Sequence, residues 1–179
     1  MNPDRKPNFP QLNSPDETVH PLDDRDLGEI SALLTACDDF SILVSGQPHQ
    51  AEDAFGLLHD LPPMKTEADK QVLGFRDRNG KLCGVLDLVS GYPEDSVAFI
   101  GLLLLLPETR GAGLGRRITQ SVETWARGAG FKALMLGVVE ENIDGLCFWK
   151  ACGFEVVETS DPRAFGQKTQ RVLRMKKVL

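Results

Sequence analysis

The chain has 179 residues, of which 41% are hydrophobic and 26% are charged, as expected for one globular domain with its own core. Its formal net charge is −6, which argues against nucleic acid as a partner because phosphates require a basic face, and which suits a cationic substrate. The first residues are polar and no apolar run is long enough to cross a membrane, so we expect a cytoplasmic protein with no membrane contact.

The N-terminal third is predicted to be helical after a polar start. Residues 1–18 contain four prolines and no periodicity, which predicts a flexible tail, with residues 19–179 forming a single domain. A short strand is expected at 19–22, followed by a helix that begins near Asp23 or Asp24. A second helix is expected from about residue 50 to 59, where Pro62 and Pro63 follow.

The middle of the chain has the pattern of an antiparallel meander. Two short apolar segments, residues 71–77 and 82–89, are joined by Asn79-Gly80, a hairpin signal because tight primed turns require positive φ. The turn 91–95 leads into the continuous apolar run 97–106. Such a run predicts a strand that is covered on both faces.

The last third alternates helices and strands. Apolar residues at helical spacing begin at Leu114, and glycines at 128 and 130 end that helix. A buried strand is expected at 132–139, then a short helix capped near Asn142, a strand at 153–158 and a final strand within 167–179. The fold class is therefore α/β, with a mixed, mostly antiparallel central sheet of about six to seven strands and helices on both faces.

Residues 110–117 suggest an anion-binding loop between the apolar run and the following helix. Gly111, Gly113 and Gly115 would let an anion approach the backbone where a helix begins, and arginines 110, 116 and 117 add positive charge. A Walker loop and a dinucleotide fingerprint both fail because Arg116 follows Gly115. A phosphate or pyrophosphate is the expected ligand, and a plain tight turn with solvated arginines is the alternative.

The cysteines give no indication of a metal site. Cys37, Cys83, Cys147 and Cys152 form no CxxC pair, and the three histidines do not cluster with them. We therefore expect thiols in a reducing compartment and no metal.

Two segments resemble the GNAT family of acetyltransferases. The segment 110–115, Arg-Gly-Ala-Gly-Leu-Gly, matches the family pattern R/Q-x-x-G-x-G/A. Residues 142–154, which run from Asn142 to Gly153-Phe154, resemble in spacing the family segment N-x-x-A-x-x-x-Y-x-x-x-G-F. Two motifs in the correct order are more specific than either alone, and the resemblance covers residues 72–157.

The resemblance implies a fold with splayed strands and acetyl-CoA as cosubstrate. It implies that the strand before the loop pairs with the pantetheine arm, that the loop holds the pyrophosphate, and that Asn142 bonds the arm. The cofactor-binding residues expected on this basis are Leu103, Leu104, Leu105, Arg110, Gly111, Ala112, Gly113, Leu114, Gly115, Arg116, Asn142 and Trp149.

Two positions at which the family has catalytic groups differ in this sequence. Trp149 stands where many members have a tyrosine acid, and Gly137 stands where some have a glutamate base. We expect Trp149 to pack against the coenzyme A arm. Tyr92 and Glu94 are the predicted catalytic residues, and the other candidates are Asp95 and Asp87 as a base and Asp38 and Asp39 as groups that attract a cationic amine.

The expected function is direct transfer of an acetyl group from acetyl-CoA to a primary amine on a small molecule or a peptide. Two alternatives stay open at this point: an acyl-CoA sensor without catalysis, favoured by Trp149 and Gly137, and an enzyme for a longer acyl donor. A homodimer is also left open.

Overall fold

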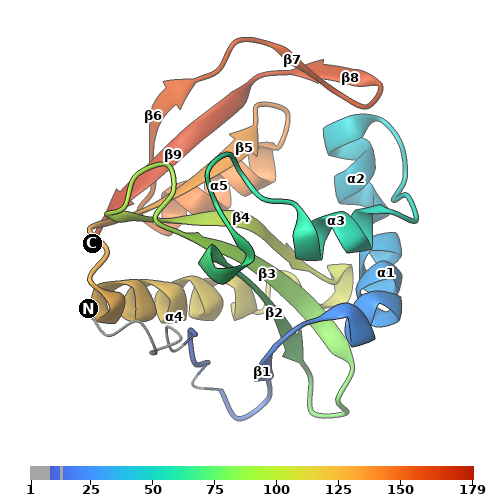
Figure 1. Cartoon of the computed structure of the whole chain (residues 1–179). Helices are drawn as coiled ribbons and strands as arrows, with labels where there is room; N and C mark the ends of the chain where they lie inside the picture. Colours follow the sequence, from blue (N-terminus) through green and yellow to red (C-terminus); the bar gives the residue numbers. More distant parts are fainter. Residues whose placement is uncertain (1–8, 13) are drawn as a thin grey trace.

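The computed structural model describes residues 9–12 and 14–179. The α-helices of this part are α1 (Leu27–Ala36), α2 (Asp38–Ser45), α3 (Asp53–His59), α4 (Leu114–Ala129) and α5 (Ile143–Ala151). The strands are β1 (Thr18–Pro21), β2 (Lys70–Arg76), β3 (Leu82–Ser90), β4 (Val97–Leu105), β5 (Ala133–Val139), β6 (Glu155–Thr159), β7 (Arg163–Phe165), β8 (Lys168–Gln170) and β9 (Val172–Val178). Figure 1 shows their arrangement.

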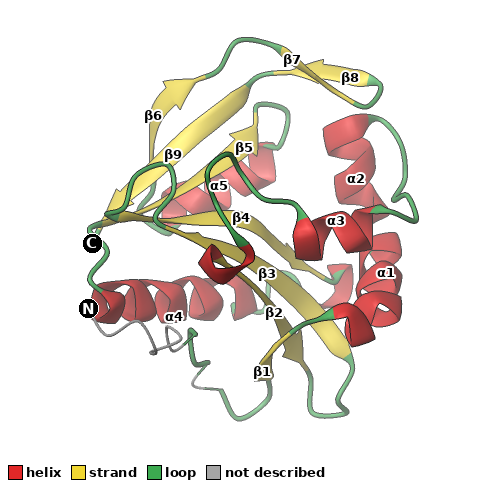
Figure 2. Cartoon of the chain, viewed as in Figure 1, coloured by secondary structure: helices red, strands yellow, loops and turns green. Residues whose placement is uncertain are grey.

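Seven strands form one sheet in the order β1-β2-β3-β4-β5-β9-β6. Every neighbouring pair is antiparallel except β4 and β5, which are parallel, so the predicted mixed sheet is confirmed. The strands β7 and β8 form a separate two-stranded sheet, visible above α2 in Figure 2. The predicted meander corresponds to β2, β3 and β4.

The two faces of the sheet are covered by different helices. Leu102 and Leu104 line a pocket together with residues of α3, whereas Leu105 approaches the first turn of α4 at Gly115. Successive strand residues point to opposite faces, so α3 and α4 lie on opposite sides of β4. The predicted apolar stripe of α4 is buried, and Leu114, Ile118 and Val122 are each at most 2% exposed. None of the helices in the described part is long and apolar enough to span a bilayer.

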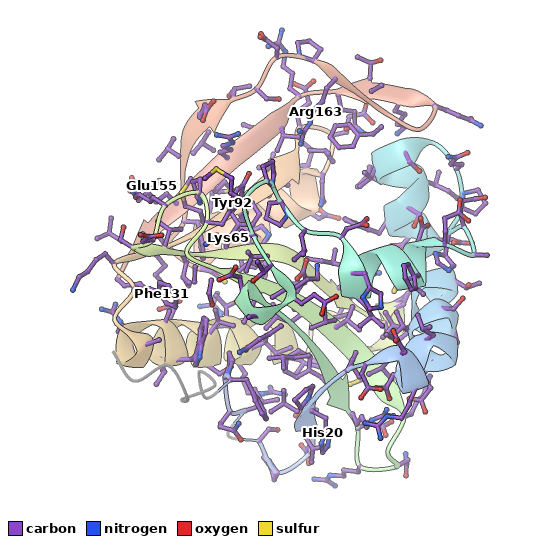
Figure 3. All side chains as sticks on the ribbon, viewed as in Figure 1. His20, Lys65, Tyr92, Phe131, Glu155 and Arg163 are labelled. Atoms are coloured by element: carbon purple, nitrogen blue, oxygen red, sulfur yellow. The ribbon has the colours of Figure 1, made fainter. Side chains whose placement is uncertain are left out.

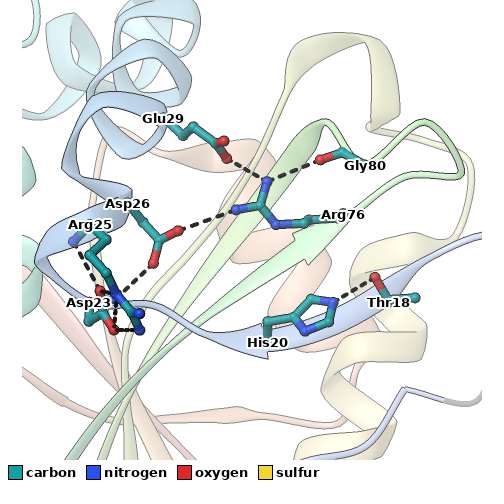
Figure 4. A network of polar contacts seen from close by, with 8 residues as sticks. All are labelled: Thr18, His20, Asp23, Arg25, Asp26, Glu29, Arg76 and Gly80. Carbon is teal, nitrogen blue, oxygen red and sulfur yellow. Dashed lines mark hydrogen bonds and ion pairs between the residues drawn. The ribbon is translucent and has the colours of Figure 1, made fainter.

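An arginine at the end of β2 anchors the start of α1 to the sheet. Figure 4 shows the Arg76 guanidinium donating to the carboxylates of Asp26 and Glu29 and to the Gly80 carbonyl. Because these partners come from the start of α1 and from the β2–β3 turn, the contact fixes α1 relative to the β2–β3 hairpin. The helices that follow α1 are thereby held over one face of the sheet.

The structure differs from the sequence-based expectations in three places. A helix, α2, lies between the two that were predicted, and it ends at Gly46, which has φ +79°. In the β2–β3 turn only Gly80 has positive φ, so the hairpin is correct but the turn is not a primed one. The final segment is divided into β8 and β9 rather than forming one strand.

The predicted flexible tail is only partly described. Residues 1–8 and 13 lie outside the described residues. Phe9 and Leu12 are partly buried and pack against the main core. The division into a tail and a single domain at residue 19 stays a prediction.

Candidate active site

The parallel strands β4 and β5 separate halfway along their length. Among the described residues they pair at only four positions, from Val97 with Ala133 to Ile100 with Leu136. Beyond Ile100, β4 continues to Leu105 beside β3 alone, and Figure 2 shows β4 and β5 diverging. One edge of β4 between residues 101 and 105 therefore offers backbone groups without a strand partner, as a ligand with amide groups would require.

A β-bulge marks the point where the strands separate. Asp87 of β3 is opposite Leu102, and the next pair is Leu88 with Ile100, so Gly101 is an extra residue. A Cβ atom at Gly101 would lie 2.3 Å from Oδ2 of Asp87. Glycine is required here because any side chain would displace that carboxylate.

The loop after β4 has the backbone geometry of an anion-binding turn. Gly111 and Gly113 have φ of +77° and +84°, a region that other residues rarely adopt. Gly113 is the residue before α4, and it caps the helix with no side chain. The first N–H groups of α4 have no partners within the helix and face outward from this turn, which is favourable for a phosphate group.

The three arginines of this loop are not equivalent. The Nε atom of Arg110 donates to the Leu105 carbonyl (2.9 Å), and its two Nη atoms bind the carboxylate of Asp39 on α2. These hydrogen bonds lower the pKa of Asp39. Arg117 is paired with Glu17 (2.9 Å). Arg116 is exposed, and no described carboxylate pairs with it, so it is the arginine best placed to meet an anion.

The second motif folds as the sequence predicted, but its side chains have structural partners. Asn142 caps α5, because its Oδ1 accepts a hydrogen bond from the Gly145 N–H (2.9 Å). Trp149 is 8% exposed and makes edge contacts with the rings of Phe148 and Phe154. Trp149 is thus a core residue, and its expected contact with the coenzyme A arm stays a prediction.

A pocket of about 600 Å³ opens beside the bulge, on the face covered by α3. Its floor is formed by β2, β3 and β4, and its walls come from α1, the α2–α3 region and the segment after α3. It is lined by Leu34, Phe40, Ser41, His49, Glu52, Asp53, Phe55, Gly56, Leu57, Asp60, Lys70, Asp87, Gly101, Leu102 and Leu104. Four carboxylates and one lysine give this pocket a net negative charge, so it favours a cationic molecule.

A buried ion pair lies at the floor of this pocket. Asp87 is 9% exposed, and its Oδ2 accepts a hydrogen bond from Nζ of Lys70 (3.0 Å). The other oxygen, Oδ1, is buried and has no hydrogen-bond partner among the described residues. Burial raises the pKa of Asp87, and the charge of Lys70 opposes this rise. A carboxylate with a free oxygen and a raised pKa is suited to accept a proton.

The two predicted catalytic residues lie elsewhere. Tyr92 and Glu94 are in the β3–β4 turn, where the ring of Tyr92 packs edge-on against Phe99. Figure 3 labels Tyr92 in this turn, near Lys65. Leu102 is five residues beyond Val97, a distance of about 16 Å along the strand. Neither Tyr92 nor Glu94 lines the pocket, whereas Asp87, the other base candidate on β3, does.

Sequence reasoning missed Lys70 and the whole of α2. Lys70 is the first residue of β2, and Asp87 is a lone charge inside the apolar β3, so two opposite charges on the strands of a predicted hairpin were the available signal. Asp39 was expected in a loop between two helices, and it lies instead in the first turn of α2.

Comparisons with known proteins agree with this geometry. The family described as "Acetyltransferase (GNAT) family" matches residues 33–154. An aminoglycoside N(6')-acetyltransferase type 1 from Stenotrophomonas maltophilia is 30% identical over 91 residues, which are 51% of this chain and 57% of that relative. The chain therefore spans little more than half the length of this curated relative.

Solved structures share the fold at low sequence identity. An acetyltransferase from Thermus thermophilus has a TM-score of 0.73 at 23% identity, over 91% of this chain and 97% of that one. Spermidine N-acetyltransferase from Vibrio cholerae, solved with CoA and spermine, has a TM-score of 0.69 at 20% identity, over 90% and 95% of the two chains. With two motifs, splayed strands and a family match over most of its length, the chain belongs to the GNAT family of acetyltransferases.

Proposed function

We propose that this protein transfers an acetyl group from acetyl-CoA to a primary amine that is bound in the pocket between α3 and β4. The observation that carries the proposal is the free Oδ1 of Asp87, which is buried at the bulge where β4 leaves β5. At this point the donor side and the acceptor side of the site meet.

The donor side is made mainly of backbone. The turn at Gly111 and Gly113 and the exposed Arg116 are suited to the diphosphate of coenzyme A. The unpaired edge of residues 101–105 is suited to the amide groups of the pantetheine arm, and its N–H groups can polarise the thioester carbonyl. The bound cosubstrate supplies a reactive thioester, which needs only an aligned neutral amine.

The acceptor side is made of side chains. Glu52, Asp53 and Asp60 surround the pocket and attract an ammonium group, while Phe40 and Phe55 supply apolar contacts. The ammonium form cannot attack a carbonyl, so it must first lose a proton. The carboxylate of Asp87, which lines the pocket, accepts this proton.

The rest of the reaction then balances without a further side chain. The neutral nitrogen forms a bond with the carbonyl carbon, and the carbon–sulfur bond breaks with its electron pair on sulfur. The second proton lost by nitrogen leaves with the sulfur as the thiol of coenzyme A, and Asp87 returns its proton to water. A buried tryptophan at position 149 is compatible with this scheme because a thiolate of moderate pKa needs no strong acid.

The amine itself is proposed only as a class. The relatives named above act on an aminoglycoside and on spermidine, and both molecules carry several ammonium groups. The acidic lining of the pocket supports a polycationic amine over a neutral or acidic one.

The test is release of coenzyme A thiol from acetyl-CoA with spermidine, an aminoglycoside and an N-terminal alanine peptide. We expect turnover with at least one amine, and we expect Asp87→Asn to lower kcat by about 10²- to 10⁴-fold. The matched control is Glu94→Gln, in the turn outside the pocket, which should keep turnover within about twofold of the parent.

Two results would overturn the proposal. Full activity of Asp87→Asn together with loss of activity in Glu94→Gln would move the base to the β3–β4 turn. Calorimetric binding of acetyl-CoA with no transfer to any amine would instead support the sensor, which the buried Trp149 at the position of the usual acid favours.

A further inference from the structure

Lys70 is unusual because its charged end is buried inside the candidate site. Its side chain is 5% exposed, although lysine is among the residues most rarely buried. Its Nζ donates to the Asp60 carbonyl (2.9 Å) and to Oδ2 of Asp87 (3.0 Å). The first partner belongs to the segment after α3 and the second to β3, so Lys70 joins the wall of the pocket to its floor.

A contribution to stability is a weak explanation for this pair. Removing two charges from water costs several kcal/mol per ion, and their attraction often does no more than offset that cost. Apolar residues of similar size would fill the same space without the penalty. A buried pair on the floor of a pocket therefore suggests a role in the site.

The contact leaves the carboxylate half free. Lys70 binds only Oδ2, and Oδ1 has no partner among the described residues, so the oxygen needed for proton transfer is not consumed. On its other side, Oδ2 is confined by Gly101, where a Cβ atom would approach it to 2.3 Å. The carboxylate is thus held by the Lys70 amine on one side and the bulge on the other.

We propose that Lys70 is a positioning residue, which fixes the Asp87 carboxylate by one oxygen on the floor of the pocket and leaves the other without a protein partner. This inference rests on the proposed function, because it needs Asp87 to be the base. Lys70 does not contact the reacting atoms, and it acts through Asp87 alone.

The charges around Asp87 predict the direction in which its pKa changes when Lys70 is replaced. Lys70 of β2 is the cation that contacts Asp87, while His49, Glu52, Asp53 and Asp60 line the same pocket from the α2–α3 region and the segment after α3. Gly101 and Leu102 of β4 carry no charge. Burial raises the pKa of Asp87 and Lys70 opposes this rise, so removal of the lysine amine raises that pKa further.

Two measurements test the inference with the variants Lys70→Met, Lys70→Arg, Asp87→Asn and the double variant. The first is the dependence of kcat/KM on pH. It uses, for every variant, the amine that the parent acetylates fastest among the three amines named above. We expect Lys70→Met to move the acidic limb of this pH profile up by about one pH unit. Lys70→Arg keeps the positive charge and should return the limb most of the way to its position in the parent. The KM for acetyl-CoA should not change.

The second measurement needs no turnover. Removal of the Lys70 amine raises the pKa of Asp87 in the fold further, so Lys70→Met should lose stability relative to the parent as pH rises through the pKa of Asp87 in the folded parent. The Tm difference should therefore grow as pH rises. In the Asp87→Asn background the same substitution should show no such pH dependence. Lys81→Met, which removes an exposed partner of Glu108, is the matched control and should leave both measurements unchanged.

The outcomes separate this inference from the proposed function. If Asp87→Asn is inactive and Lys70→Met has an unmoved acidic limb, Lys70 has no positioning role and the proposed function stands. If Lys70→Met shows the same Tm trend with and without Asp87, the coupling is absent and the inference fails. If Asp87→Asn keeps full turnover, the proposed function itself fails.

Discussion

The two sides of the candidate site are built from different materials. The proposed donor side, formed by the end of β4, the glycine turn and the start of α4, consists of backbone groups in one continuous stretch, residues 101–116. The acceptor side combines side chains from α1, the α2–α3 region, β2, β3 and β4. Backbone geometry leaves a local signature in the sequence, whereas a pocket of side chains depends on which distant segments the fold brings together.

The sharpest way to separate the two sides is Gly101→Ala. The added Cβ would lie 2.3 Å from Oδ2 of Asp87, so the carboxylate must move away from its bond with Lys70. A misplaced base lowers turnover, and we expect a decrease of about 10- to 100-fold in kcat. The new Cβ points at Asp87 and leaves the backbone amides of residues 101–105 in place, so the affinity for coenzyme A should fall by less than kcat does. Gly28→Ala, on α1 with nothing within 4 Å of the new Cβ, is the control. Equal kcat values for the two variants would show that the bulge does not position Asp87.

The reverse effect is expected from Gly113→Glu, which changes the donor side alone. Glu at φ +84° is strained, and its charge would repel a diphosphate at the start of α4. We expect the affinity for coenzyme A, measured by calorimetry, to fall at least about tenfold. Gly128→Glu, near the other end of the same helix, adds the same charge without positive φ and should bind normally. Unchanged affinity in Gly113→Glu would remove the loop from the cofactor site.

The buried Trp149 should contribute mainly to the core, whether or not it also contacts the coenzyme A arm. Its ring contacts Phe148 and Phe154, and Trp149→Phe removes part of these contacts without adding a polar group. We expect a loss of about 1–3 kcal/mol in the free energy of unfolding, measured with denaturant, and a kcat within about twofold of the parent. A large loss of kcat with normal stability would restore Trp149 as a functional residue.

One ion pair connects the two sides, between Asp39 of α2 and Arg110 of the donor loop. Both side chains are more than a third exposed, so Asp39→Asn should cost less than about 1 kcal/mol in stability at moderate salt. The pKa of Asp39 lies below its ordinary value, so whatever the pair contributes is present at neutral pH and is lost as pH falls through that lowered value. A Tm difference that persists at acidic pH would contradict this assignment.

The contrast between local backbone geometry and contacts of distant side chains also explains which features could be predicted from the sequence. The order of strands, the start of α4 after Gly113 and the cap at Asn142 depend on periodicity and turn chemistry, which act over a few residues. The glycine turn was therefore found, but the orientation of Arg110 toward Asp39 was not, because these residues are 71 positions apart. The hairpin of β2 and β3 was predicted, but the pairing of individual residues within it was not, so the contact between Lys70 and Asp87 was missed.

Tyr92 and Glu94 show how little residue type alone decides, and their catalytic role stays a prediction. Their residue types suit acid–base chemistry, and they precede the glycine loop in the chain, but β4 carries them to the end of the sheet away from the splay. Residue type identified candidates, and only strand direction could choose among them.

Whether Asp87 acts as the base is decided by the ratio of kcat/KM between the parent and Asp87→Asn, measured from about pH 6 to pH 10. If Asp87 removes the ammonium proton, the ratio should be about 100 or more near pH 7 and should shrink toward unity above about pH 9, where the amine loses that proton to water. A ratio that stays constant over the whole range would mean that Asp87 only supports the structure of the pocket, and the account would be wrong.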